Sequence, residues 1–281
     1  MKERFRYRAW KKFLQALSNN SESNQIELLE ETDWDVCLVL DACRYDTLYT
    51  LGLWPVSKVI SPASCTPEWI DELATSSAVK DSHIIAANPQ YERLFESGDY
   101  DIERLWETAW DAEHSTVLPE SVLDRIDELL TDSQGPIFAH LLQPHWPYVV
   151  KLGKTWKAPY PSNSPWETDR GTISSVQVAM ERGVIDLELA KQCYVASVSS
   201  TWKVLEMYVS RWIQHNHSVV ITSDHGETFG RVTELGLVEH PCKTHIRALT
   251  DVPWIHIQPT DGREVGDGSI ESRLRALGYR A

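Results

Sequence analysis

The sequence predicts a three-layer α/β/α domain, in which helices cover both faces of a mainly parallel, mixed central sheet. The main observation is an alternation along the chain, because short apolar runs rich in β-branched residues are separated by helix-like segments. The second is length, since 281 residues can bury such a core without staples. The third is composition, because 42% hydrophobic and 24% charged residues are ordinary for a globular protein.

The expected strands are short apolar runs, and the expected helices repeat apolar residues at helical spacing. The strands are 36–40, 56–60, 82–86, 136–141, 218–223 and 252–257, and the helices are 66–76, 119–131 and 186–213. Segment 119–131 opens with Pro and Glu, which favour the first turn of a helix. Ligands of such sheets collect beyond the carboxyl ends of the strands, so the residues that follow each strand are the candidate functional residues.

The ends of the chain and one internal segment fall outside this alternation. Residues 1–30 are expected to form a basic amphipathic helix and a connector, and residues 31–281 a single domain. Two interpretations of the N-terminal helix stay open: it packs on its own domain, or it makes a peripheral contact with an anionic membrane surface. Residues 144–171 are rich in Pro, Trp and Lys and are expected to form a long surface loop. A last helix is expected in ESRLRALGYRA.

Charge and cysteine patterns argue against several classes of protein. The formal net charge of -14 disfavours a nucleic-acid partner, which requires a basic face. Neither an apolar run long enough to span a membrane nor a secretory signal is visible, so a cytoplasmic location is expected. The five cysteines are scattered and form no Cys-x-x-Cys pair, so neither a disulfide framework nor a zinc ribbon is predicted.

Three acidic and imidazole side chains directly follow two of the expected strands. Asp41 ends VCLVLD, and Asp224 and His225 end VVITSDH. If both strands are central and parallel, these side chains meet at one edge of the sheet, where two carboxylates repel unless a cation lies between them. Carboxylate oxygens and imidazole nitrogens suit a divalent metal. Capping of the following helix is the alternative role of each Asp.

A hydroxyl and several basic residues complete the candidate site. Thr66, in SCTPEW, stands near a helix N-terminus and is either a metal-activated nucleophile or a helix cap. His140 and His145 lie at and just past a strand end, in a proline-stiffened loop that suits a general acid or an oxyanion donor. His240 and Lys243 precede the final strand, where they can neutralise a substrate oxyanion.

The order of these motifs resembles the sulfatase branch of the alkaline phosphatase superfamily. The motifs are Asp41, SCTPEW at 64–69, PHWPY at 144–148, SDHGE at 223–227, and EHPCK at 239–243 before DVPWI. The resemblance spans about residues 35–260 and implies an alkaline-phosphatase-like catalytic domain. It also implies a phosphate or sulfate ester substrate and one or two divalent ions, with Mn, Zn, Mg and Ca not distinguished.

The resemblance also assigns roles to individual residues. It implies that Asp41, Thr66, Asp224 and His225 ligate the metal and that Thr66 is the nucleophile. His145 and His240 would contact the ester oxygens or the leaving group. His240 is alternatively a ligand of a second metal, as in the two-zinc phosphatases.

Two departures from the family pattern keep alternatives open. Ala42 stands where sulfatases have a second Asp, and Trp69 where they have Arg after a formylglycine-forming Cys. Cys65 occupies the position of that Cys and is the alternative nucleophile. Arg44 is either a bidentate ligand of the ester or an ion-pair partner of Asp46.

Three functions are therefore weighed. The first is a metal-dependent hydrolase that forms a covalent intermediate on Thr66. The second is a transferase that moves a phosphoglycerol- or phosphoethanolamine-type group to a glycan or a lipid head group, with His140, Lys243 and loop tryptophans near the substrate. The third is a catalytically inactive protein that binds esters on the same fold.

Overall fold

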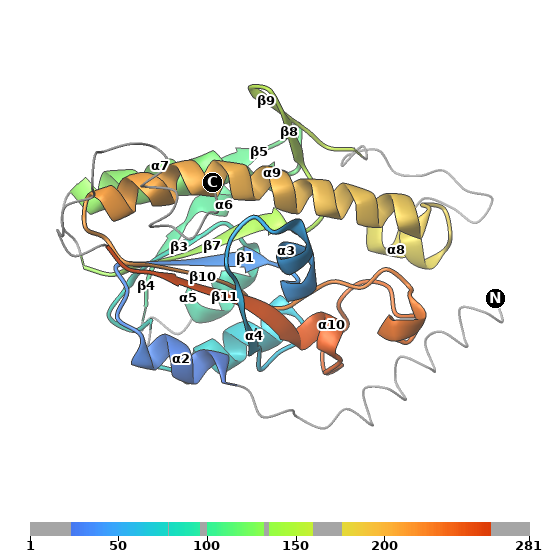
Figure 1. Ribbon diagram of the computed structural model, residues 1–281, viewed down its shortest axis with the longest axis horizontal. Helices are drawn as coiled ribbons and strands as arrows, with labels where there is room; N and C mark the ends of the chain where they lie inside the picture. The colour runs from blue at the N-terminus through green and yellow to red at the C-terminus, as the bar shows by residue number, and fades with distance from the viewer. Residues whose placement is uncertain (1–23, 78, 96–99, 132–134, 160–175, 260–281) are drawn as a thin grey trace.

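The computed structural model describes residues 24–77, 79–95, 100–131, 135–159 and 176–259. A central sheet has seven strands (Figure 1). In spatial order they are β2 (Ser57–Ile60), β11 (Asp251–Ile257), β10 (Val219–Ser223), β1 (Val36–Asp41), β7 (Ile137–Pro144), β3 (His83–Ala86) and β4 (Asp101–Arg104). The pairs from β10 to β4 are parallel, whereas β11 runs antiparallel to both β10 and β2. The sheet is therefore mixed and mainly parallel, as predicted.

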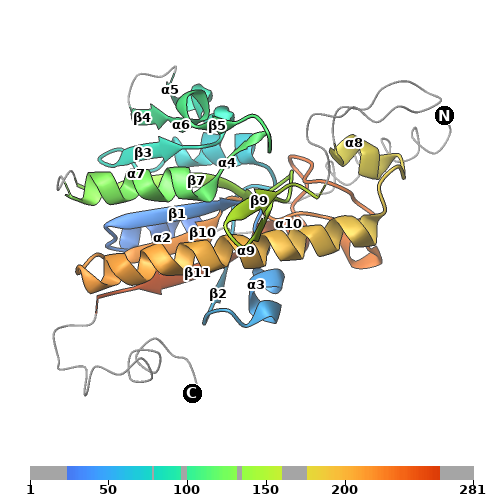
Figure 2. The same cartoon turned by 90° about the horizontal axis from the view of Figure 1, so that it is seen from above.

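Helices lie on both faces of this sheet (Figures 1 and 2). On one face lie α7 (Pro119–Thr131) and the long α9 (Leu187–Gln214), and on the other lie α2 (Gln25–Glu31) and α4 (Thr66–Leu73). Because successive side chains of a strand point to opposite faces, β1 contributes to two cores. Val36, Leu38 and Leu40 pack with α7 and α9, and Cys37 and Val39 pack with α2 and α4.

Shorter elements connect and flank these layers. They are α3 (Tyr45–Leu51), η1 (Pro89–Tyr91), α5 (Glu92–Phe95), α6 (Leu105–Thr108), β5 (Trp110–Asp111), β6 (Thr116–Val117), β8 (Val150–Leu152), β9 (Thr155–Lys157), α8 (Val176–Glu181), η2 (Val232–Glu234) and α10 (Arg247–Thr250). Among the described residues, no helix is both long and apolar enough to span a bilayer.

The structure confirms the six expected strands and the three expected internal helices, with shifts of a few residues at their ends. The seventh strand, β4, escaped prediction because its sequence DIER alternates without a β-branched apolar run. The expected loop 144–171 is corrected over its first half, where β8 and β9 form a hairpin. Trp156 of this hairpin is buried, and its indole nitrogen donates to Glu120 of α7 at 2.9 Å. Residues 160–171, the N-terminal helix and the C-terminal helix lie outside the described residues.

Candidate active site

Two adjacent parallel strands bring the predicted carboxylates to one edge of the sheet. Leu40 of β1 stands in register with Ser223 of β10, so the residues that follow, Asp41 and Asp224, emerge side by side. The chain turns at once after Asp41, because Ala42 has a φ of 59°. The Ala42 backbone N–H then donates to Asp224 Oδ1 at 3.0 Å. Ala42, where sulfatases carry a second Asp, thus holds Asp224 through its backbone.

The Thr66 hydroxyl lies against the end of β10, at the first residue of α4. Its Oγ1 is 2.7 Å from Asp224 Oδ2 and 3.1 Å from His225 Nε2. His225 Nδ1 lies 2.7 Å from the Gly226 carbonyl oxygen, to which it can only donate. Because burial lowers the pKa of His225, the ring is neutral and its Nε2 carries a lone pair directed at Thr66.

Gly226 is required at the turn beyond this histidine. A Cβ at this position would lie 2.1 Å from the Ala248 carbonyl oxygen, a distance that no side chain tolerates. Its own N–H donates to the Leu249 carbonyl at 2.8 Å, which fixes the turn against α10. The Gly226 backbone therefore passes close to the backbone of residues 248–249, which only glycine allows. The turn that results directs the His225 imidazole toward the sheet edge.

Several buried carboxylate and imidazole atoms converge here. Asp41 Oδ1 has no hydrogen-bond partner among the described residues and lies 3.8 Å from His225 Nε2. His225 Nε2 is in turn 3.3 Å from Asp224 Oδ2. Burial and the charge of Asp224 raise the pKa of Asp41 well above its ordinary value. For Asp224, burial alone would raise the pKa, but His225, His140, Thr66 and the Ala42 N–H together hold it below its usual value.

His140 completes this first group of acceptors. It lies fully buried in β7, and its Nε2 is 3.7 Å from Asp224 Oδ2 and has no hydrogen-bond partner in the described part of the chain. Burial lowers the pKa of His140 to about 4, so the ring is neutral. One ligand atom each from Asp41, His140 and Asp224 lies within 4.8 Å of the others. Unpaired carboxylate oxygens are costly to bury without a cation, so this donor set fits a divalent metal.

A second group of potential metal ligands adjoins the first. It consists of His145, Glu227 and His240, again with ligand atoms within 4.8 Å of one another. The His240 ring stacks on His225 with centroids 4.5 Å apart, so the two groups are neighbours. Its Nδ1 lies 3.3 Å from Glu227 Oε1. Burial, followed by the nearby His240, lowers the pKa of His145 to about 4, which leaves a neutral imidazole available for a metal or an ester.

Sequence reasoning missed two members of this site. Glu227 is fully buried, and burial raises its pKa; its signal was its place as the fifth residue of the SDHGE motif. Asn88 donates to Asp41 Oδ2 at 2.7 Å and thereby orients the carboxylate. Its signal was its position two residues beyond β3, at the same sheet edge as Asp41 and Asp224.

Two residues predicted to bind substrate differ in how their side chains are engaged. The Arg44 guanidinium donates to Asp46 Oδ2 at 2.6 Å and to Glu234 Oε1 at 2.6 Å. It therefore forms the ion pair that the sequence analysis gave as the alternative role. The prediction that Arg44 binds the ester is replaced by this ion pair, because the N–H groups that would donate to an ester already donate to carboxylates. Lys243 has an exposed side chain, and its backbone N–H donates to Glu68 Oε2 at 3.1 Å.

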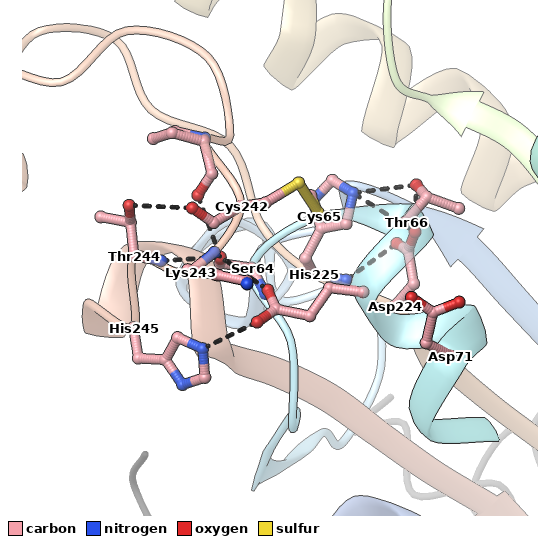
Figure 3. Close-up of a disulfide and its surroundings, with 12 residues drawn as sticks. Ser64, Cys65, Thr66, Asp71, Asp224, His225, Cys242, Lys243, Thr244 and His245 are labelled. Atoms are coloured by element: carbon pink, nitrogen blue, oxygen red, sulfur yellow. Dashed lines mark hydrogen bonds and ion pairs between the residues drawn. A yellow bond between two sulfur atoms is a disulfide. The ribbon is translucent and has the colours of Figure 1, made fainter. Parts of the chain in front are cut away.

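A disulfide corrects the prediction for Cys65. Cys65 is bonded to Cys242, which lies 177 residues away in the sequence (Figure 3). The Cys65 sulfur therefore is not a free thiol, and Cys65 is withdrawn as the alternative nucleophile. The sequence spacing predicted no disulfide framework, because a pairing between distant cysteines leaves no local spacing motif. Cys37, Cys43 and Cys193 are not in disulfide bonds.

Trp69, which stands where sulfatases have Arg, is a core residue. Its ring stacks on Phe138 with centroids 6.2 Å apart and meets the edge of His140 at 5.8 Å. Its indole nitrogen donates to Gln25 Oε1 at 2.9 Å. The residue therefore fixes α4 against the sheet instead of offering a positive charge to an anion.

Comparison of the sequence with protein-family models found no match, and comparison with curated proteins found none either. Comparison of the fold did find similar structures. The soluble domain of lipooligosaccharide phosphoethanolamine transferase A from Neisseria meningitidis aligns with a TM-score of 0.53 and 12% identity, over 86% of this chain and 78% of that domain. The C-terminal periplasmic domain of phosphoethanolamine transferase EptC from Campylobacter jejuni aligns with a TM-score of 0.49 and 19% identity, over 80% and 78%.

The likeness to the Neisseria domain confirms the predicted fold class, a mixed and mainly parallel seven-stranded sheet between two helical layers. At this level of identity the likeness concerns the fold, so function is argued from the site itself.

Proposed function

We infer that this protein is a metal-dependent enzyme that transfers or hydrolyses a phosphate or sulfate ester, with Thr66 as the nucleophile. One observation carries the proposal: the Thr66 hydroxyl lies 2.7 Å from Asp224 Oδ2 and 3.1 Å from His225 Nε2, beside buried acceptors that fit a cation. A threonine that served only as a helix cap would not need two potential acceptors beside its hydroxyl and two buried ligand atoms without partners, Asp41 Oδ1 and His140 Nε2, in the same site.

The residues that would hold a divalent ion are those whose ligand atoms converge. Asp41, Thr66, Asp224 and His225 surround the first position, with His140 beside it, and the group of His145, Glu227 and His240 surrounds the second. A bound divalent ion lowers the pKa of a nearby hydroxyl and offsets the negative charge of the ester oxygens.

The chain's own residues then have distinct tasks. Thr66 Oγ1 attacks the phosphorus or sulfur atom, the bond to the leaving oxygen breaks, and the group becomes an ester of Thr66. Asp224 Oδ2, which accepts from the Thr66 hydroxyl at 2.7 Å, is the acceptor placed to take its proton, and His225 Nε2 would serve as a ligand of the ion. The His240 ring stacks on His225 with centroids 4.5 Å apart, and His145 lies next to His240, so both neutral rings are placed to orient the ester. A second hydroxyl then attacks the same atom and restores Thr66.

Transfer to an acceptor alcohol is the reaction we place before hydrolysis. The Neisseria domain with a TM-score of 0.53 is a phosphoethanolamine transferase, which supports transfer of a phosphorus-containing group. The Thr66 ester is common to both reactions, and only the second nucleophile differs, being water in one and an alcohol in the other. Analysis of the products of a model phosphodiester with and without added glycerol separates them, because a transferase forms a glycerol adduct.

Replacement of Thr66 tests the nucleophile directly. Thr66→Ala is expected to lower the turnover of an aryl phosphodiester by ~10³-fold or more, since removal of a nucleophile removes the covalent path. Thr66→Ser keeps a hydroxyl at the same place and is the matched control, which should retain part of the activity. Metal content is measured on both variants to show that the site is still loaded. Full activity in Thr66→Ala would exclude Thr66 as the nucleophile.

A further inference from the structure

Two segments that are far apart in the sequence are fastened together beside Thr66. One is the start of α4, residues 64–68, and the other is the loop 240–245 that carries His240. The disulfide between Cys65 and Cys242 joins them covalently, and Figure 3 shows it next to Thr66 and His225. Cys65 immediately precedes the proposed nucleophile, and Cys242 follows His240 by two residues.

Glu68 and Ser64 add a second, non-covalent fastening between the same segments. Glu68 Oε2 accepts from the Ser64 N–H and from the Lys243 N–H, both at 3.1 Å, and Glu68 Oε1 lies 3.3 Å from His245 Nε2. Ser64 Oγ donates to the Pro241 carbonyl at 3.0 Å and accepts from the Thr244 N–H at 3.0 Å. We call the disulfide and these bonds the 65–242 clamp.

The His240 loop needs such a clamp because its own backbone does not form a regular element. Glu239 and Lys243 both have positive φ, 73° and 58°, and no helix or strand is formed between them. On its N-terminal side the loop is anchored by the Glu239 N–H, which donates to the Thr228 carbonyl at 3.2 Å. On its C-terminal side the anchor is the clamp, so His240 is held between two fastenings.

The position of His240 decides whether the second ligand group exists. His240 is its only member on this loop, whereas His145 follows β7 and Glu227 follows β10. The ring stacks on His225 at 4.5 Å and lies 3.3 Å from Glu227, so a small displacement of the loop would separate the ligand atoms. The first group, Asp41, His140 and Asp224, receives no residue from this loop.

We propose that Cys65, Cys242 and Glu68 are positioning residues that hold His240 against His225 and Glu227, so that opening the disulfide weakens the second metal position and leaves the first intact. This inference rests on the proposed function, because it assumes two metal positions. A dithiol reductant opens the clamp: its two thiols are oxidised to a disulfide, the bond between the Cys65 and Cys242 sulfurs breaks, and two cysteine thiols form. Cys242 is partly exposed and Cys65 is buried, so attack begins at the Cys242 sulfur.

The test measures zinc binding by equilibrium dialysis on wild type, Cys242→Ala, Glu68→Gln and Cys193→Ser. Wild type is expected to bind two ions per chain, and Cys242→Ala to bind the second about 10–100-fold more weakly, as when supporting residues of a metal site are removed. Dithiothreitol, removed before dialysis, should reproduce this effect in wild type and add nothing in Cys242→Ala. Glu68→Gln should give a smaller loss, and Cys193→Ser, which changes a cysteine outside the disulfide, should give none.

A readout that needs no metal accompanies the binding data. Hydrogen exchange of the metal-free protein is expected to accelerate at Lys243 and Thr244 after reduction, because their N–H groups donate across the clamp. If Cys242→Ala does not fold, hydrogen exchange still tests the proposal, because oxidised wild type can be compared with reduced wild type and with Glu68→Gln.

Several outcomes would overturn the positioning role. They are two free thiols at Cys65 and Cys242 in a peptide map of the oxidised protein, equal zinc affinities in wild type and Cys242→Ala, and only one ion in wild type. Unchanged exchange after reduction would overturn it as well. Full activity in Thr66→Ala would instead refute the proposed function and leave the hydrogen-exchange result standing.

Discussion

At the scale of single residues, the site is defined by acceptors that lack donors. Asp41 Oδ1 and His140 Nε2 are buried without a hydrogen-bond partner among the described residues, and they lie beside Asp224 Oδ2, which accepts from the Thr66 hydroxyl at 2.7 Å. Each unpaired atom destabilises a fold by roughly 1–3 kcal/mol, and more when it is charged. A chain retains such atoms together where a cation satisfies them, which is why the geometry favours a metal over helix capping by each Asp.

The raised pKa of Asp41 predicts a pH dependence of metal binding. Burial and the charge of Asp224 raise this pKa, so the carboxyl binds a proton that a metal must displace. Affinity should therefore rise with pH, by up to about tenfold per unit while Asp41 is protonated. His140, with a pKa of about 4, is already neutral above pH 5 and adds no slope.

Calorimetry of zinc binding in buffers of different ionisation enthalpy counts the released protons. Asp41→Asn should release about one proton fewer than wild type, because the amide cannot ionise. Asp71→Asn is the control, since Asp71 is exposed and pairs with Arg93 outside the site. Equal proton counts in Asp41→Asn and wild type would contradict the assignment of this proton to Asp41.

At the scale of elements, the site depends on how α4 is fixed to the end of β10. Gln25, the first residue of α2, is fully buried and joins the two. Its Nε2 donates to Thr222 Oγ1 at 2.8 Å and to the Ser223 carbonyl at 2.7 Å, and its Oε1 accepts from the Trp69 indole at 2.9 Å. One amide therefore links the helix of Thr66 to the strand that precedes Asp224.

Loss of this amide should destabilise the protein measurably. Gln25→Leu leaves the Trp69 N–H and the Ser223 carbonyl without this partner, and we expect the free energy of unfolding to fall by roughly 2–4 kcal/mol. Urea denaturation measures the change. The control is Gln90→Leu, because Gln90 has an exposed side chain and should change stability by less than about 0.5 kcal/mol. A Gln25→Leu variant as stable as this control would show that the bridge is not made in solution.

At the scale of the whole molecule, the disulfide bears on where the protein works. Disulfides persist in oxidising compartments and are rare in a reducing cytoplasm. The bond joins Cys65 to Cys242, 177 residues further along the chain, in the loop that carries His240. We propose an oxidising compartment as the alternative to the cytoplasm expected from the sequence, and the location stays a prediction.

Alkylation of intact cells before lysis tests this location. If the bond is closed in the cell, denatured but unreduced protein should carry label at Cys37, Cys43 and Cys193 only. Reduction before labelling should then add Cys65 and Cys242, which is the internal control. Five labelled cysteines without reduction would show a reducing environment and retain the cytoplasmic prediction.

The sequence alone was sufficient for the layers of the fold and for the prediction that Asp41, Thr66, Asp224 and His225 lie together. Strand and helix periods are local, so β1, β10 and α7 were visible in short windows. Asp41, Thr66, Asp224 and His225 were visible because parallel strands place their carboxyl ends at one edge, which turns a position in the sequence into a position in space.

The tertiary structure alone decided which distant residues meet. The pairing of Cys65 with Cys242, the insertion of Gln25 between α4 and β10, and the approach of His240 to Glu227 depend on how separate segments pack. None of these contacts leaves a local spacing pattern, because each joins segments whose order along the chain does not fix their distance. The same packing places Arg44 in ion pairs with Asp46 and Glu234, so its guanidinium is not directed at a substrate.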